Sequence, residues 1–248
     1  MDSAKYQDIK EISEDYDLAI IATPTDQHME QLKYLDGKIK YIYCEKPLCK
    51  ALDKGIFTFR SQIFVGNCYR FDFGTRKLKE LMPKCGQIRY ASLENAYSFK
   101  KLHPHYKWED YDGIIFDDSH CINSSRYLFG NPIEYNFKMI RKDRAMFAWK
   151  TIKEIEVYHD TNILNEVYKK RIEVVGELGN LVYNWGAHHI YFCPADESPR
   201  IAYAYDFQSH LFEAMKYVVD VVKKGGEFEE NTVFDACIDM QCIEELLR

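Results

Sequence analysis

The first part of the chain alternates short, continuously apolar runs with amphipathic stretches. The run Leu18-Ala-Ile-Ile-Ala22 is typical of a strand buried on both faces, as strands of parallel sheets are. Two further apolar runs follow at short spacing with helix-compatible segments between them, and this order predicts βαβ units and a parallel sheet. Strands are expected over residues 18–22, 40–44 and 63–66, and helices over residues 6–14, 25–35 and 51–57.

The pattern changes in the second part, where longer alternating runs replace the short apolar ones. Residues 87–97 alternate between two faces and predict a strand, and strand-like runs continue from 133 to 205. Gly176-Glu-Leu-Gly179 predicts a hairpin turn, and Gly130-Asn131-Pro132 ends a helix expected over residues 114–129. We therefore expect an α+β domain with mostly antiparallel strands and helices on one face. Other helices are expected over residues 74–82, 208–224 and 232–247, and a polar aromatic loop over residues 99–112.

Composition and charge narrow the possible function classes. The chain has 248 residues, with 33 Lys and Arg against 39 Asp and Glu, and its net charge of −6 argues against a nucleic-acid binder. The longest apolar runs are far shorter than a membrane span, and the charged start predicts no signal peptide. Eight scattered cysteines without a closely spaced pair predict free thiols in a reducing compartment. We therefore expect a cytoplasmic protein that binds neither nucleic acid nor a membrane.

Glu45-Lys46-Pro47 is the first candidate for chemistry, because it lies where a predicted parallel strand ends. Ligands of open α/β sheets bind at the carboxyl ends of strands. Pro47 holds Lys46 outside the helical region, and a partly desolvated lysine there can donate a proton, accept one or stabilise an oxyanion. A surface lysine before a helix-starting proline fits the same residues.

Asp117-Asp118-Ser119-His120 is the second candidate. On one continuous helix, Asp117 and His120 are three residues apart and share a face, so the carboxylate can orient the imidazole. Such a pair can transfer protons near neutral pH. The alternative is structural: Asp117 or Ser119 caps the helix, and His120 lies on an interface.

The loop from His103 to Asp112 combines histidines, aromatic side chains and carboxylates. Such a set suits stacking and hydrogen bonding to a sugar, and His103 and Trp108 are its candidate substrate contacts. A solvated loop tip fits the loop equally well. His103, His105 and Asp118 leave open a metal-dependent sugar enzyme, but the spacing of cysteines and histidines matches no common zinc pattern, so we expect no metal site.

In their order along the chain, these motifs resemble the Gfo/Idh/MocA family, which contains glucose–fructose oxidoreductase and inositol dehydrogenase. The resemblance covers nearly the whole chain, and its most specific element is Glu45-Lys46-Pro47 followed by a helix that carries His120. The form Asp117-Asp118-Ser119-His120 resembles the branch found in sialic-acid and surface-polysaccharide gene clusters. The matching stretches are residues 17–25 with His28, 43–48, 65–71, 113–120 with 126–130, and 171–179.

The resemblance implies a nicotinamide-dependent oxidoreductase that acts on a sugar or a nucleotide sugar by hydride transfer. It implies that Lys46 and His120 sit beside the substrate carbon that exchanges the hydride, and that Asp117 is the acidic residue of the same helix. It also implies an open sheet that pairs with another subunit, and hence a homo-oligomer. The resemblance places NAD or NADP at Thr23, Pro24, Thr25, His28, Glu45 and Lys46, and the substrate at Tyr69 and Arg70.

The fold that follows is α/β plus α+β. Residues 1–70 are expected to form an incomplete, Rossmann-like dinucleotide-binding domain, and residues 71–248 the substrate and oligomerisation domain, with terminal helices that can pack back on the first. No Gly-x-Gly-x-x-Gly turn is present to hold the pyrophosphate, and none of the twelve glycines precedes Gly37. Three explanations stay open: a fragment of a longer enzyme, a reduced form without catalysis, or a partner chain that supplies the missing half. The alternative function is therefore a catalytically inactive sugar-binding or scaffold subunit.

Overall fold

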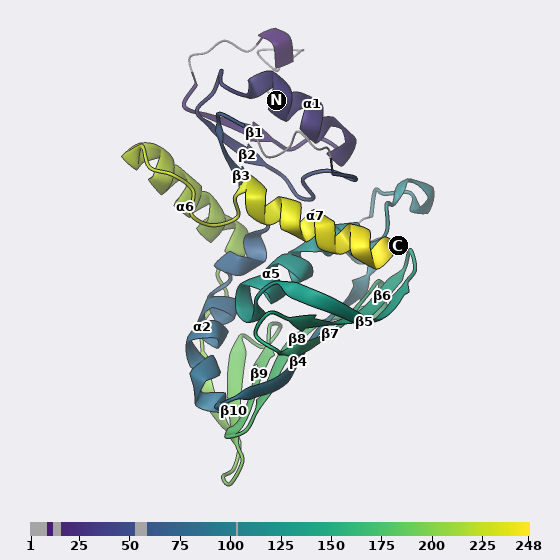
Figure 1. The fold of residues 1–248 in the computed structure, drawn as a ribbon, viewed down its shortest axis with the longest axis vertical. Coiled ribbons are helices and arrows are strands. Elements are labelled where there is room, and N and C mark those ends of the chain that lie inside the picture. The colour runs from purple at the N-terminus through teal and green to yellow at the C-terminus, as the bar shows by residue number, and fades with distance from the viewer. Residues whose placement is uncertain (1–8, 12–15, 53–58, 103) are drawn as a thin grey trace. The chain divides into compact units, whose positions relative to one another are not determined.

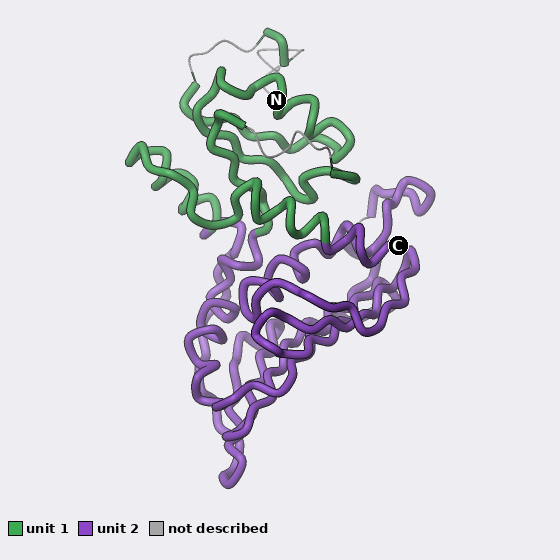
Figure 2. The backbone as a smooth tube through the Cα atoms, in the orientation of Figure 1, with its two compact units in different colours: residues 1–67, 214–241 green, residues 68–213, 242–248 purple. Residues whose placement is uncertain are grey.

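The computed structural model describes residues 9–11, 16–52, 59–102 and 104–248 of the chain. The chain forms two compact units, which Figure 2 shows in different colours. The first unit comprises residues 1–67 and 214–241, and the second comprises residues 68–213 and 242–248. Each unit is therefore assembled from two separate segments of the chain.

A three-stranded parallel sheet forms the centre of the first unit (Figure 1). All four residues of its middle strand are buried, as expected of a strand covered on both faces. The prediction of three short parallel strands, with a helix between the first two, is confirmed. In spatial order the strands are β1 (Leu18–Ile21), β2 (Tyr41–Cys44) and β3 (Gln62–Val65), and the helix is α1 (Thr25–Leu35).

Segments from the C-terminal part of the chain complete the first unit. Helices α6 (His210–Lys224) and α7 (Val233–Leu247) contribute most of their lengths to it. Phe228 follows α6 and precedes α7 in the sequence. The centre of its ring lies 5.8 Å from that of Tyr41 and 5.6 Å from that of Phe64. The sheet and the returning segment therefore share one apolar core.

An eight-stranded mixed sheet forms the centre of the second unit. Its neighbouring strands are antiparallel except β4 and β7, which are parallel. The predicted fold class, a parallel Rossmann-like sheet followed by a mostly antiparallel open sheet, is confirmed. In spatial order the strands are β11 (Arg200–Ala204), β10 (His189–Pro194), β9 (Gly179–Asn184), β8 (Leu164–Gly176), β4 (Ile88–Ser98), β7 (Glu156–Asn162), β6 (Arg144–Thr151) and β5 (Pro132–Ile140).

Helices cover one face of this sheet. Helix α5 (Ser119–Phe129) is buried along most of its length, and α2 (Phe73–Leu81) packs against β9. A Cβ atom at Gly74 would lie 2.2 Å from the Tyr183 Cζ atom, so only glycine fits at this close approach. The strand register places Tyr90 and Tyr158 on the opposite face, where they stay 43% and 46% exposed. The sheet therefore has a covered face and an open face.

The helix expected over residues 114–129 differs from the prediction. It is split at Asp118 into α4 (Ile114–Asp117) and α5, and Asp118 has backbone angles φ −93° and ψ 24°. The buried Asp118 carboxylate accepts a hydrogen bond from the Asn95 Nδ2 of β4 at 2.7 Å. This contact with a strand distant in sequence holds Asp118 at the break and separates Asp117 from the helix of His120.

Smaller differences concern the ends of other elements. The expected loop over residues 99–112 contains helix α3 (Phe99–Leu102) and the 3-10 turn Trp108–Asp110. Of the helix expected over residues 6–14, the structure describes the 3-10 turn Ile9–Glu11, and most of residues 51–57 lie outside the described residues. All eight cysteines are free thiols. Within the described part of the chain, no helix is both long enough and apolar enough to cross a membrane.

Candidate functional site

The candidate residues of the first unit lie on the loops that follow β1 and β2. Both loops leave the carboxyl edge of the parallel sheet, where open α/β sheets bind ligands. His28 of α1 joins the loops: its Nε2 lies 2.8 Å from the Thr23 carbonyl oxygen, and its Nδ1 lies 3.0 Å from that of Pro47. The buried His28 therefore contacts both loops.

Thr23, Pro24 and Thr25 form the turn from β1 into α1. The Thr23 hydroxyl donates to the Gln31 Oε1 at 2.8 Å, which ties the turn to the second turn of the helix. Pro24 is the N-cap residue, and Thr25 is the first residue of α1. The N-terminus of α1 consequently opens at the same carboxyl edge as the loop after β2.

Glu45 and Lys46 directly follow β2. The Glu45 amide donates to the Ile21 carbonyl at 2.9 Å, and the Tyr43 hydroxyl donates to the Glu45 Oε1 at 2.9 Å. Backbone and carboxylate of Glu45 are thereby fixed. Lys46 is half-buried, and its peptide bond to Pro47 is cis. The structure thus brings all the predicted cofactor residues of the first unit to one edge of its sheet.

Tyr69 is the centre of a second cluster, which belongs to the second unit. The His120 ring stacks on the Tyr69 ring, with 4.2 Å between ring centres and 23° between planes, and the Lys170 Nζ lies 2.9 Å from the Tyr69 ring centre. Tyr69 therefore contacts both groups through its ring. Trp185 and His210 meet the Tyr69 ring at 4.6 Å and 5.2 Å in edge-on contacts. The structure therefore brings the predicted residues Tyr69 and His120 together and adds three residues that the sequence analysis missed.

Burial dominates the electrostatics of this cluster. Lys170 is 6% exposed, and burial lowers the pKa of its ammonium to about 8, while the nearby Asp118 and Asp72 carboxylates act in the opposite direction. Burial, followed by the charge of Lys170, lowers the pKa of His210 to about 4. Burial also raises the pKa of the Asp118 carboxyl. Near neutral pH, the cluster therefore holds a neutral His210 beside a lysine that releases its proton more readily than usual.

The sequence does carry a signal for Lys170. Lys169 and Arg171 are exposed on β8, whereas Lys170, Ile172 and Val174 are buried in alternation with them. A lysine in phase with buried aliphatic residues departs from the pattern of a half-buried strand. Assigning the two faces of this strand would therefore have singled out Lys170.

Asp117 and Asp118 have different surroundings. The Asp117 Oδ2 accepts hydrogen bonds from the Tyr97 hydroxyl at 2.6 Å and from the Tyr111 hydroxyl at 3.3 Å. Asp118 is 4% exposed and lies at the break between the two helices. The expectation that Asp117 and His120 share one face of a continuous helix is wrong, because the helix does not continue through Asp118.

The remaining predicted substrate residues lie in separate surroundings. The buried Arg70 donates from its Nε to the Asn123 Oδ1 of α5 at 2.6 Å. Trp108 is 42% exposed, and its ring contacts Phe99 at 5.5 Å. His103 lies outside the described residues. Among the residues that the structure describes, no group of three or more His, Cys, Asp or Glu side chains is arranged to hold a metal ion.

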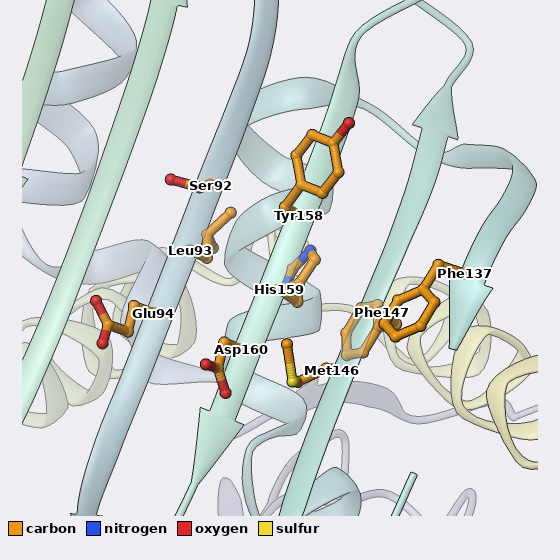
Figure 3. Close-up of a pocket in the computed structure, with 9 residues that line it drawn as sticks. All are labelled: Ser92, Leu93, Glu94, Phe137, Met146, Phe147, Tyr158, His159 and Asp160. Atoms are coloured by element: carbon orange, nitrogen blue, oxygen red, sulfur yellow. The ribbon is translucent and has the colours of Figure 1, made fainter. Parts of the chain in front are cut away.

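A hollow of about 360 Å³ lies on the sheet of the second unit, over strands β4 to β7 (Figure 3). Two of its carboxylates are already paired: Asp160 accepts from Arg144 at 2.7 Å, and Glu94 accepts from Lys169 at 2.7 Å. None of the described candidate residues lines this hollow. The lining residues are Ser92, Leu93, Glu94, Phe137, Met146, Phe147, Tyr158, His159 and Asp160.

Comparison with known proteins finds relatives among dehydrogenases. No family profile matches the chain. The chain is 27% identical over 194 residues to an inositol 2-dehydrogenase of Mycolicibacterium gilvum (strain PYR-GCK). The match covers 68% of this chain and 53% of the relative, so the chain spans about half the length of the curated relative it matches.

Solved structures share the fold at low sequence identity. The MviM dehydrogenase of Clostridium difficile has a TM-score of 0.81 at 12% identity, over 98% of this chain and 82% of its own. An aldose–aldose oxidoreductase of Caulobacter crescentus, complexed with glycerol, has 0.78 at 15% identity, over 97% and 78%. An oxidoreductase of Agrobacterium radiobacter, in complex with NAD+, L-tartaric acid and magnesium, has 0.73 at 14% identity, over 93% and 76%. These relatives are Gfo/Idh/MocA-type oxidoreductases, and the chain has their fold.

Proposed function

We propose that the chain acts as an NAD(P)-dependent oxidoreductase on a sugar or nucleotide sugar, by hydride transfer. The observation that carries the proposal is the position of Glu45 and Lys46. They directly follow a buried parallel strand, at the sheet edge where α/β folds bind ligands, in a fold shared with dehydrogenases. A half-buried lysine at that edge is suited to proton transfer at a substrate hydroxyl.

The cofactor residues fit one end of a nicotinamide dinucleotide. Thr23, Pro24 and Thr25 form one loop and Glu45 the other, and His28 contacts both loops. This edge offers carbonyl, hydroxyl and carboxylate groups for the nicotinamide and its ribose. The sequence contains no Gly-x-Gly-x-x-Gly turn for the pyrophosphate. The proposal therefore assigns only the nicotinamide end to these residues and leaves NAD and NADP as alternatives.

In the proposed reaction, a hydride leaves the substrate carbinol carbon for the nicotinamide ring, which is the chemistry the cofactor supplies when bound. The chain's own residues handle the proton. Lys46 or His120 accepts the proton of the substrate hydroxyl, and Tyr69 holds the His120 ring in place by stacking. Asp117 supplies a carboxylate to the same reaction. Tyr69, Arg70, His103 and Trp108 are the proposed substrate contacts.

A substitution of Lys46 tests this assignment. We expect Lys46→Met to reduce the formation of reduced nicotinamide by about a hundredfold or more, because a positioned proton-transfer group contributes at least that much. Turnover is followed by the absorbance of the reduced nicotinamide with myo-inositol, aldoses and UDP-sugars as substrates. Lys33→Met, on the exposed surface of α1, is the matched control and should retain wild-type turnover. Equal turnover in wild type and Lys46→Met would contradict the assignment.

A catalytically inactive sugar-binding or scaffold subunit is the second candidate. Calorimetric titration with NADH and NADPH separates the two. Micromolar binding supports the oxidoreductase, whereas a folded protein that binds sugars but neither cofactor supports the alternative.

We also propose that the protein is a cytoplasmic homo-oligomer that pairs through its open sheet face. Tyr90, Phe137 and Tyr158 are exposed there at 43%, 52% and 46%. Light scattering measures the oligomeric state directly, and Tyr158→Glu should shift an oligomer towards the monomer, because a carboxylate in an apolar interface is costly to desolvate. A monomeric wild-type protein would contradict the pairing.

A further inference from the structure

Asp118 joins helix α4 to helix α5, and its backbone is hydrogen-bonded to both. Its amide donates to the Ile114 carbonyl at 2.8 Å, and its carbonyl accepts from the Cys121 amide at 2.9 Å. The break between the helices therefore occurs at a single residue. His120 is the second residue of α5, so the direction in which its side chain leaves the backbone depends on the conformation of this break.

The side chain of Asp118 ties this break to the sheet. Its Oδ1 accepts a hydrogen bond from the Asn95 Nδ2 at 2.7 Å, and both residues are buried. Asn95 lies on β4, a central strand whose backbone pairs with β7 on one side and with β8 on the other. A strand paired on both sides is held by its neighbours, so its side chains keep their positions. The bond from Asn95 therefore fixes the break relative to the sheet.

Helix α5 also packs against the 3-10 turn Cys68–Phe71. The Tyr69 ring of this turn stacks on the His120 ring, and the Arg70 Nε donates to the Asn123 Oδ1 at 2.6 Å. His120 and Asn123 are three residues apart on α5, so they share a face. The bond from Arg70 sets which face of α5 meets the turn. The place where the helix begins depends on a second contact, at its start.

We propose that Asp118 is a positioning residue whose bond from Asn95 holds the start of α5, so that the His120 ring stays stacked on Tyr69. The inference rests on the proposed function, in which His120 is one of two candidate proton acceptors. Stacking fixes the plane of the imidazole and with it the directions in which its nitrogens donate or accept. Proton transfer requires hydrogen-bond reach, so a small displacement of the ring slows the step. The buried Asp118 acts through His120 and not on the substrate.

NMR measures the position of the His120 ring without depending on turnover. Protons that lie over an aromatic ring are shifted upfield by its ring current, so the wild-type His120 signals should lie upfield of those of an exposed histidine. His120→Gln identifies these signals, and Tyr69→Leu should move them downfield. We expect Asp118→Ala to move them downfield as well. Asp118→Asn should leave them near the wild-type position, because the asparagine oxygen still accepts from the Asn95 Nδ2.

Kinetics tests whether this position serves the reaction. Asp118→Ala should lower kcat about tenfold or more and change KM much less, because displacing a proton-transfer group slows the chemical step. Asp118→Asn should recover most of the lost kcat although it carries no charge, which separates the hydrogen bond from the effect of the carboxylate on Lys170. Thr151→Val is the matched control. It removes a different buried hydrogen bond of the sheet, from the Ile155 amide at 3.3 Å, and should change neither the His120 signals nor kcat.

Three results would overturn the inference: His120 signals that stay at the wild-type position in folded Asp118→Ala, an equal displacement by Asp118→Asn, or an equal displacement by Thr151→Val. Asn95→Ala removes the same bond from the strand side, should also displace the signals, and takes the place of Asp118→Ala if that variant does not fold. The two proposals fail separately. Displaced signals in Asp118→Ala with no turnover by wild type refute only the oxidoreductase, whereas equal turnover by an active wild type and Asp118→Ala refutes only the role of Asp118.

Discussion

The buried position of His159 makes the folded second unit less stable in acid. The side chain lies on β7, is 5% exposed, and its ring stacks on Phe147 at 4.3 Å and meets Trp149 at 4.6 Å. Its Nε2 is buried and has no hydrogen-bond partner among the described residues. Burial in this apolar stack lowers the pKa of His159 to about 3. The folded protein therefore keeps His159 neutral at pH values where the unfolded chain binds a proton.

The sign and size of the effect follow from the two pKa values. Above an unfolded pKa of about 6.5, His159 is neutral in both states and has no effect on the pH dependence. As the pH falls from there towards 3, the unfolded state binds the proton and the folded state does not, so the free energy of unfolding decreases. At pH 5, a folded pKa of about 3 corresponds to a loss of about 2 kcal/mol relative to pH 7.

Urea unfolding at pH 7 and pH 5 measures this loss. His159→Phe keeps an aromatic ring between Phe147 and Trp149 but cannot bind a proton. We expect the decrease in unfolding free energy between the two pH values to be about 2 kcal/mol smaller in His159→Phe than in wild type. Any packing cost of the substitution cancels, because it is present at both pH values. His105→Gln, at an exposed histidine, should behave as wild type. Equal pH-dependent losses in wild type and His159→Phe would refute the reasoning.

Two further predictions concern packing. Gly74→Ala should lower the free energy of unfolding by about 2 kcal/mol or more, because its Cβ would lie 2.2 Å from the Tyr183 Cζ; a loss below the error of urea titration would contradict the close approach. With an aromatic disulfide reagent, only Cys193 should react in the native protein, since the other seven cysteines are buried, and all eight should react in denaturant. Rapid native reaction of several thiols would argue against this packing.

The elements of the first unit could be predicted because their signals are local. The apolar run at residues 18–22 and the helix pattern at 25–35 give β1 and α1 within one residue of their observed ends. The turn at Gly176–Gly179 likewise gives the hairpin of β8 and β9, where Gly179 has φ +148° and a Cβ would lie 2.5 Å from the Cys193 carbonyl oxygen. In these segments, the conformation is determined by the residues of the segment itself and not by contacts with distant parts of the chain.

The break at Asp118 could not be predicted in this way. The apolar and polar positions from 114 to 129 are compatible with one helix, and neither glycine nor proline marks a stop within it, although Asp117 and Ser119 are also residues that can cap a helix start. What ends the first helix is a buried carboxylate that accepts from Asn95, 23 residues earlier in the chain. Only the pairing of strands in the second unit brings these two groups together, so the break is a tertiary effect.

Lys170 is intermediate between these cases. Its signal is local, since a charged residue falls in phase with buried aliphatic ones on β8, but the signal has meaning only after the buried face is known. The candidate site residues found from the sequence lie in loops and at helix starts, and Lys170 lies in a strand. Yet a strand residue on the covered face is held by its backbone ladder, which positions a donor more firmly than a loop does. Lys170 is therefore held inside the fold among aromatic rings, whereas His105 and the exposed carboxylates of residues 104–112 are in contact with water.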